Sequence, residues 1–149
     1  MVFPVDLFEL SFASFLVSNE INYCLSKHAV RLGLSLLELQ VLWTIVRFGE
    51  TTMIDIARLT ARPKNEFAPA LESLEADGLV AKIYHEETKK CLISATAQGK
   101  ALIEKMTPCS KAGCGFKALD SEAIKAFIAQ AYKLVSVFRG TEFIEKTKS

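Results

Sequence analysis

Apolar residues recur at helical spacing near the start of the chain. From about residue 6 to residue 32 they fall on a broad stripe, which predicts one long helix that is hydrophobic nearly all round. The stripe consists of Leu7, Leu10, Ala13, Val17, Ile21, Cys24 and Leu25. Such a helix needs burial on several sides, and in a chain of 149 residues a partner subunit is an obvious source of it.

Capping residues mark three shorter helices in the middle of the chain. Ser35 and Glu38 form a capping box for a helix that stops near Gly49, and Thr52 caps a second helix. Pro63 suits the first turn of a third helix, where its missing N–H costs nothing. The third helix has Phe67, Leu71 and Leu74 as its apolar face and ends at Gly78 in a left-handed cap, with Leu79 beyond it as the apolar contact.

The pattern then changes to strands and returns to helices. Residues 79–84 and 91–95 read as two strands that the polar turn 85–90 joins into a hairpin. Thr96 caps a helix over 97–106 that Pro108 terminates, and Asp120 or Ser121 caps the last helix. The apolar stripe of that helix comprises Ile124, Phe127, Ile128, Ala131, Leu134, Val135 and Phe138. Three helices and a hairpin predict a winged helix-turn-helix, so the fold class is mainly α with a small β-hairpin wing (α+β).

Four segments in this order resemble the MarR family of transcriptional regulators: residues 32–45, 51–59, 71–82 and 86–102. The resemblance covers roughly residues 30–105. It fits one MarR-like domain over 1–149, with a winged helix-turn-helix head at 33–100 and dimerisation helices at 1–32 and 101–149. It implies a homodimeric repressor that binds double-stranded DNA at a palindromic operator. A cytoplasmic location is expected separately, because neither a signal peptide nor a membrane span is predicted. Release by a small aromatic effector or by cysteine oxidation is also implied.

The stretch RPKNEFAPALESLEADGLV, residues 62–80, would contain the recognition helix. Arg62, Lys64, Asn65 and Glu66 are the expected contacts, since Asn65 matches adenine and Glu66 can accept from cytosine. The alternative is that Lys64 and Glu66 belong only to a solvated first turn. The stretch carries a net charge of −2, from Arg62 and Lys64 against Glu66, Glu72, Glu75 and Asp77. Because DNA affinity rests mainly on phosphate neutralisation, this balance opposes binding.

Pro69 interrupts this helix and leaves three interpretations open. A proline inside a helix costs about 3 kcal/mol relative to alanine. The helix could be bent and present only its first turns to DNA. Its DNA-binding role could have lapsed, or it could begin later and leave residues 64–68 as a loop.

Lysines gather on the predicted wing. Lys82, Lys89 and Lys90 are expected to contact phosphates or the minor groove, the alternative being that they only solubilise the turn. The wing motif of the family, Asp-x-Arg, is replaced by Glu87-x-Lys89, and lysine lacks the planar fork of arginine.

The four cysteines add one further hypothesis. Cys109 and Cys114 share a loop and could form a redox pair, although ordinary thiols are the simpler interpretation. Cys24 and Cys91 lie on apolar faces and are predicted to be small core residues. No metal site, cofactor or enzymatic motif is expected.

Composition agrees with a folded chain that does not partner a membrane. Half of the residues are hydrophobic and 23% are charged, and no apolar run reaches the roughly 18 residues that span a bilayer. The start of the chain has no early basic residue, so a signal peptide is not expected. A rival function stays open: a winged-helix protein-interaction module that has lost operator binding.

Overall fold

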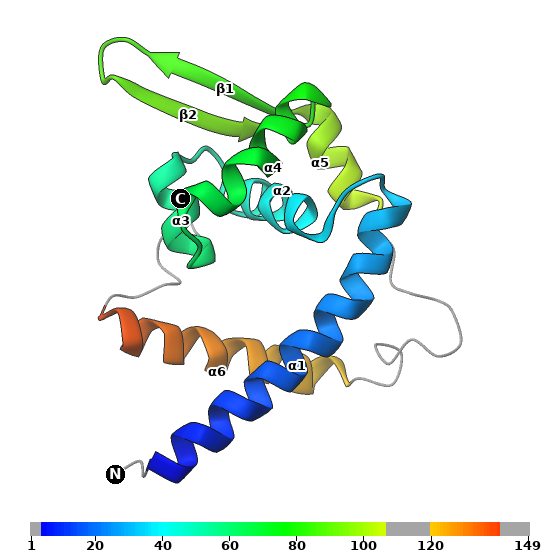
Figure 1. The fold of residues 1–149 in the computed structure, drawn as a ribbon, viewed down its shortest axis with the longest axis vertical. Coiled ribbons are helices and arrows are strands. Elements are labelled where there is room, and N and C mark those ends of the chain that lie inside the picture. Colours follow the sequence, from blue (N-terminus) through cyan, green and yellow to red (C-terminus); the bar gives the residue numbers. More distant parts are fainter. Residues whose placement is uncertain (1–3, 107–119, 141–149) are drawn as a thin grey trace.

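The computed structural model describes residues 4–106 and 120–140, which form six helices and one hairpin (Figure 1). The elements are α1 (Pro4–Arg31), α2 (Leu36–Phe48), α3 (Met53–Thr60), α4 (Lys64–Ala76), β1 (Val80–His85), β2 (Lys90–Ala95), α5 (Ala97–Glu104) and α6 (Ser121–Arg139). This order confirms the predicted mainly helical winged helix-turn-helix.

Four helices, α2, α3, α5 and α6, begin at capping residues that were predicted. Ser35 Oγ accepts a hydrogen bond from the Glu38 N–H at 3.1 Å, and Glu38 Oε1 accepts one from the Ser35 N–H at 3.2 Å. Thr52 caps α3 through its side chain in the same way. Of the two candidates for the last helix, Asp120 is the N-cap. These caps satisfy backbone N–H groups that the first helical turn leaves unpaired.

The start of α4 differs from the prediction by one residue. Pro63 is the N-cap, with extended backbone angles, and Lys64 is the first helical residue. The helix then runs without a break through Pro69 to Ala76, so the interpretation of residues 64–68 as a loop is wrong. Pro69 has no N–H, and the carbonyl of Asn65, four residues earlier, therefore loses its usual helical donor.

The end of α4 is fixed by two backbone hydrogen bonds. The Leu79 N–H donates to the Leu74 carbonyl at 2.9 Å, and the Gly78 N–H donates to the Glu75 carbonyl at 3.0 Å. Gly78 has a φ of 72°, which a side chain would disfavour. This is the Schellman arrangement, with Leu74 and Leu79 both in the core as its apolar contact.

The two strands pair antiparallel with a shorter turn than predicted. Val80 lies opposite Ala95, and His85 lies opposite Lys90, so only residues 86–89 remain in the turn. One further residue joins the hairpin from the α2–α3 connection: Thr51 forms a bridge with Ile93, with N···O distances of 2.9 and 2.7 Å. The base of the wing is thereby tied to the helices.

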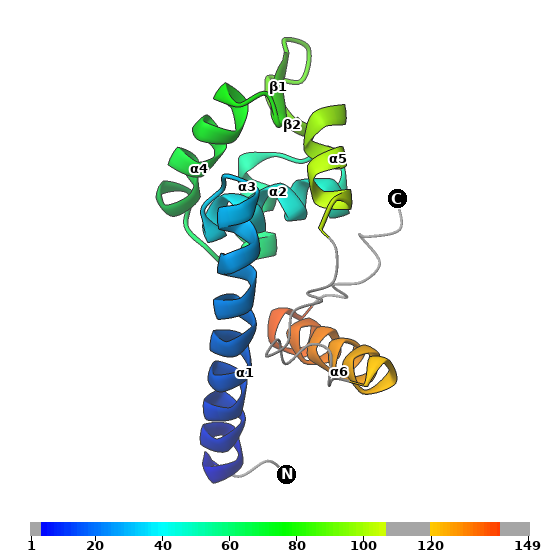
Figure 2. The same cartoon turned by 90° about the vertical axis from the view of Figure 1, so that its right-hand side faces the viewer.

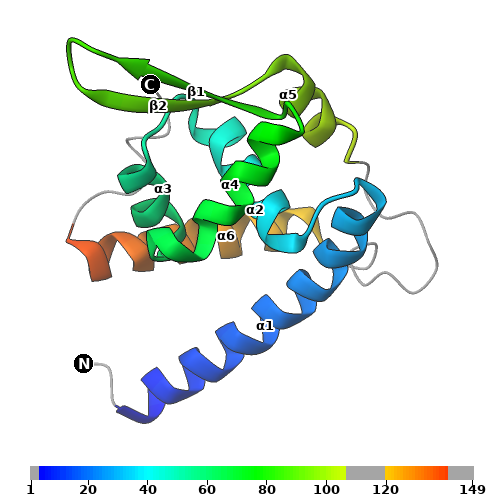
Figure 3. The ribbon, with the colours of Figure 1, turned by 45° about the horizontal axis from the view of Figure 1, so that its top comes forward.

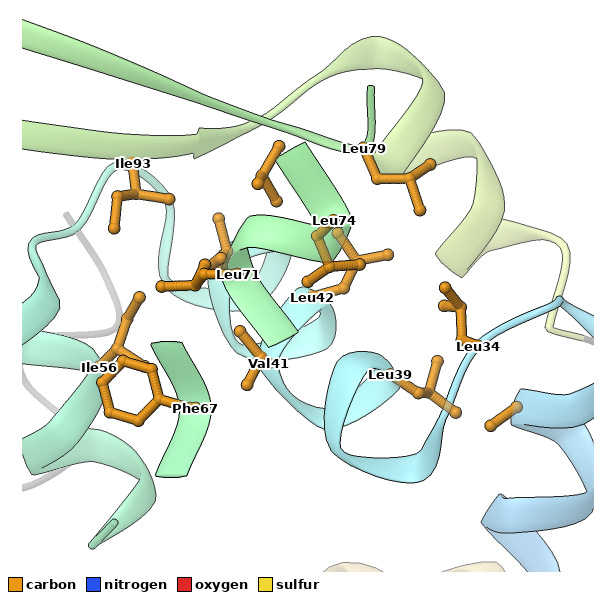
Figure 4. Close-up of a cluster of buried hydrophobic side chains, with 13 residues drawn as sticks. Leu34, Leu39, Val41, Leu42, Ile56, Phe67, Leu71, Leu74, Leu79 and Ile93 are labelled. Atoms are coloured by element: carbon orange, nitrogen blue, oxygen red, sulfur yellow. The ribbon is translucent and has the colours of Figure 1, made fainter. Parts of the chain in front are cut away.

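The core of the head surrounds α2 (Figure 4). Val41 and Leu42 from α2 are fully buried, and they meet buried side chains of α3, α4 and the hairpin. The largest fully buried residues are Phe67, Leu42, Ile45, Ile56, Leu71, Leu74, Ile93 and Val41. This packing holds α4 and the base of the wing against α2 and α3.

The terminal helices are apolar but lie largely outside this core. Figures 1 and 2 show the N-terminal part of α1 leading away from the head, and Figure 2 shows α6 apart from α1. Phe8 on α1 is 77% exposed, Phe138 on α6 is 75% exposed, and no residue of α6 is buried. Both helices therefore leave apolar side chains uncovered in the single chain.

Length and apolar composition decide whether one of the described helices could cross a bilayer. None of them is by itself both long and apolar enough to cross a membrane. Residues 5–31 and 36–48 reach that length and composition only as a pair, which is bent by 90° at its break.

Candidate nucleic-acid interface

The solvent-facing side of α4 is defined by its buried side. Phe67, Leu71 and Leu74 point into the head, so the opposite stripe at helical spacing consists of Asn65, Pro69, Glu72 and Ala76, all of them exposed. This stripe offers an amide, a proline ring, a carboxylate and a methyl group, and it carries no cation.

The four residues predicted at the start of α4 lie together. Arg62 precedes the helix, and Lys64, Asn65 and Glu66 form its first turn, all of them exposed. Arg62 Nη1 lies 3.4 Å from Glu66 Oε2, so these two charges are paired with each other. Lys64 forms no ion pair among the residues that the structure describes. Among the described residues, it is therefore the one cation at the start of α4 without a carboxylate partner.

Lys82 sits apart from the other two wing lysines. Its Nζ lies 3.9 Å from Glu75 Oε1, which links β1 to the last turn of α4. It is opposite Ile93 in the hairpin and shares a sheet face with that buried residue. Lys82 is thus placed at the root of the wing, where its charge is partly offset.

The turn between β1 and β2 forms the far end of the wing (Figure 3). Lys89 is in this turn, and Lys90 is the first residue of β2 after it. Both are exposed, and Lys89 adopts a left-handed φ of 52° that closes the turn. Glu86 and Glu87 share the same turn, so the tip has as many carboxylates as lysines. A wing with this balance has weak attraction for phosphates unless its carboxylates point away from them.

The sequence analysis did not identify the solvent-facing stripe of α4, formed by Asn65, Pro69, Glu72 and Ala76, as one surface. Glu72 and Pro69 are at its centre, yet only the first turn was singled out as a contact surface. The signal was present, because the spacing of Phe67, Leu71 and Leu74 fixes the helical phase and with it the residues opposite. A second missed contact joins α4 to α2, where the Ser73 hydroxyl lies 3.0 Å from Glu38 Oε2.

The cysteine predictions have different outcomes. Cys24 and Cys91 are half-buried, so the prediction of core residues is wrong for both. Cys24 lies on α1, which packs against α2, and Cys91 pairs with the exposed Tyr84 toward the tip of the wing. Cys109 and Cys114 lie outside the described residues. Within the described ranges, no cluster of His, Cys, Asp and Glu side chains could hold a metal ion.

A cavity of about 660 Å³ lies between α1, α2, the end of α3 and the end of α5. One part of its lining is polar: Ser18, Asn22, Gln40, Thr44, Thr60 and Arg62. Three of these are linked, since the Gln40 Nε2 donates to Asn22 Oδ1 at 3.2 Å and the Asn22 Nδ2 donates to Ser18 Oγ at 3.4 Å. The rest of the lining is apolar and includes Trp43 and Met106. Such an amphipathic cavity suits a small organic molecule.

Comparisons with known proteins agree with the winged-helix assignment. Residues 29–96, just under half of the chain, match the family model described as "Sugar-specific transcriptional regulator TrmB". A comparison with curated proteins found no match.

Solved structures match over a larger part of the chain. A MarR family transcriptional regulator from Silicibacter pomeroyi has a TM-score of 0.71 at 18% identity, covering 90% of this chain and 93% of that one. MepR of S. aureus in complex with DNA has a TM-score of 0.63 at 19% identity, covering 87% and 97%. A mutant MarR from E. coli complexed with operator DNA has a TM-score of 0.64 at 16% identity, covering 87% and 95%. The chain therefore has the winged helix-turn-helix fold of the MarR-family transcriptional regulators.

Proposed function

We propose that this chain is a DNA-binding transcriptional regulator, acting as a repressor, that binds duplex DNA through α4 and the wing. The observation that carries the proposal is the likeness of nearly the whole chain to MarR-type folds, two of which were solved bound to DNA. In a winged helix-turn-helix the second helix of the motif, here α4, enters the major groove. Arg62, Lys64 and Asn65 then contact DNA from the start of α4, and Lys89 and Lys90 do so from the wing tip.

The regulator acts as a homodimer on a palindromic operator. Support comes from the exposed apolar side chains of α1 and α6, which a second copy would cover. A symmetric pair would present two copies of α4 to two half-sites, as two-fold operators require.

A small molecule in the cavity beside α2 releases the regulator from DNA. The cavity touches α1, which belongs to the proposed dimerisation module, and Arg62, which precedes the recognition helix. A small molecule in this cavity therefore acts on both the dimerisation module and the start of the recognition helix. The match to the sugar-specific family ends at residue 96, so it covers the head and says little about which effector this cavity takes. Oxidation of Cys109 and Cys114 is the alternative route to release.

One observation favours a second function. The outward stripe of α4 carries Glu72 and no cation, and the wing tip has balanced charges. A surface of this kind fits a protein partner better than it fits phosphates. The rival is therefore a winged-helix protein-interaction module that keeps the fold and the dimer.

A salt titration separates the two functions. The purified chain is mixed with labelled fragments of its upstream region, and affinity is measured by fluorescence anisotropy from low to moderate salt. A regulator loses affinity steeply as salt rises, because phosphate contacts release counterions. Absence of binding to any of these DNA fragments at low salt would contradict the regulator and favour the interaction module.

A further inference from the structure

Pro69 lies in the middle of the solvent-facing stripe of α4. It is exposed and follows Asn65 by four residues, so the two side chains share one helical face and lie about 6 Å apart along the axis. The opposite face is held in place, because Phe67 and Leu71 are fully buried in the core of the head (Figure 4). Asn65 and Pro69 are therefore presented to solvent in a defined register.

The chemistry of the stripe limits the bases that it can bind. Guanine is most often read by two hydrogen bonds that arginine or lysine donates to its N7 and O6 atoms. The stripe has no cation, since Arg62 precedes the helix and is paired with Glu66. Lys64 lies about 100° around the helix from Asn65. Glu72, the next residue of the stripe, only accepts hydrogen bonds when ionised. The stripe therefore cannot form the usual contact with guanine.

The ring of Pro69 offers only apolar contacts to the edge of a base. Proline has no N–H and no polar atom in its side chain. In the major groove, the apolar group that distinguishes one base from the others is the 5-methyl group of thymine. An amino group of adenine or cytosine placed against the ring would lose its hydrogen bond to water, which costs free energy. Thymine is therefore the base that suits Pro69 best.

We propose that Pro69 determines operator specificity by packing its ring against the methyl group of a thymine. Asn65 binds an adenine from the same stripe. Because base pairs stack about 3.4 Å apart, the spacing of about 6 Å places the two bases about two base pairs from each other. Each half-site then carries an A·T pair at both positions. The inference rests on the proposed function, since it requires α4 to enter the major groove.

Selection from duplexes of random sequence provides the DNA probe. The full chain is mixed with the duplexes at low salt, and the enriched sequence is identified. Each of its thymines is then replaced in turn by deoxyuridine, which removes only the methyl group. We expect one thymine in each half-site at which this replacement weakens binding by about fourfold, the factor that burial of one methyl group implies. Fluorescence anisotropy measures the affinities.

Three variants assign this sensitivity to Pro69. Pro69→Ser should bind the thymine and uracil duplexes equally, and it should fold, because it removes a proline from a helix interior. Ala76→Ser, at the far end of the same stripe, is the matched control and should retain the fourfold difference. Asn65→Ala should lose the preference for adenine but keep the difference between thymine and uracil.

A second pair of duplexes tests the same methyl contact. At the sensitive thymine, the wild-type chain should bind a pair of 5-methylcytosine with guanine about fourfold more tightly than an unmethylated C·G pair. Pro69→Ser should bind the two equally.

The outcomes separate this inference from the proposed function. A sensitivity to uracil that survives in Pro69→Ser would reflect the shape of the DNA and overturn the inference. An enriched sequence without a methyl-sensitive thymine would also overturn it, while leaving the regulator intact. Enrichment of no sequence at low salt would refute the proposed function and the inference together.

Discussion

The carbonyl of Leu79 lies directly against the α-carbon of Gly99. A Cβ atom built at Gly99 would clash with the oxygen and carbon of that carbonyl, and would also lie 3.3 Å from Leu42 Cδ1. The same carbonyl accepts a hydrogen bond from the Thr96 N–H at 3.0 Å. The first turn of α5 therefore packs against the corner between α4 and β1, and only glycine permits this approach.

Replacing this glycine should destabilise the head. We expect Gly99→Ala to lower the free energy of unfolding by about 1–3 kcal/mol, because the clash is with backbone that cannot move without shifting α5. Urea denaturation followed by circular dichroism measures the change. Ala101→Ser, an exposed position in the same helix, is the control and should change stability by less than about 0.5 kcal/mol. A neutral Gly99→Ala would show that the corner is not closely packed.

Pro69 should lower the stability of α4. Pro69→Ala restores an N–H for the Asn65 carbonyl, and we expect the free energy of unfolding to rise by about 1–2 kcal/mol, less than the full helix-interior cost because proline also restricts the unfolded chain. Ala76→Ser on the same face serves as the control. If DNA affinity falls as stability rises, the proline shapes the reading surface. If the affinity for DNA is unchanged, Pro69 affects only the stability of α4.

Glu72 should oppose DNA binding if the outward stripe of α4 faces the duplex. By Coulomb's law in water, a carboxylate about 10 Å from several phosphates weakens binding by about fivefold, so Glu72→Gln should tighten it by that factor at low salt. Anisotropy at low and moderate salt tests this, since the gain should shrink as salt rises. Glu122→Gln on α6 is the charge-matched control. Equal affinities for Glu72→Gln and the wild type would argue that another surface meets DNA.

The wing lysines should contribute to the salt dependence of binding. Asparagine tolerates the left-handed backbone of Lys89, so we choose Lys89→Asn combined with Lys90→Gln. Loss of two phosphate contacts should reduce the slope of log affinity against log salt by about 2. Lys125→Gln with Lys133→Gln removes the same charge from α6 and should leave the slope unchanged. An unaltered slope in the wing variant would place the wing outside the interface.

The apolar faces of α1 and α6 should hold the proposed dimer together. Carboxylates introduced there by Phe8→Glu and Phe127→Glu cannot be buried without a large desolvation cost, so the dissociation constant should rise at least about 100-fold. Sedimentation equilibrium measures this change. Ile54→Glu is the control, because Ile54 is 79% exposed on α3 and lies outside both terminal helices. A monomeric wild-type chain would exclude the homodimer.

Local signals in the sequence were sufficient for the elements of the head. Ser35, Thr52 and Thr96 predict where helices begin because a side-chain oxygen within three residues satisfies the first N–H groups. Gly78 predicts where α4 ends, because it can adopt the left-handed cap. The one-residue differences at Pro63 and at both ends of the turn arise because propensities do not decide which residue makes the last hydrogen bond.

Only the tertiary structure decided how these elements meet. The bridge between Thr51 and Ile93 is a single residue pair, so no periodic pattern in the sequence could predict it. The close approach of Gly99 to Leu79 likewise joins residues from different elements. Cys24 and Cys91 lie on apolar faces, yet burial depends on what packs against a face, and each face is only partly covered. The sequence alone determined a winged helix-turn-helix, since caps, glycines and apolar spacing act within a few residues. The cavity exists only in the folded chain, because α1, α2, the end of α3 and the end of α5 are far apart in the sequence and meet in space.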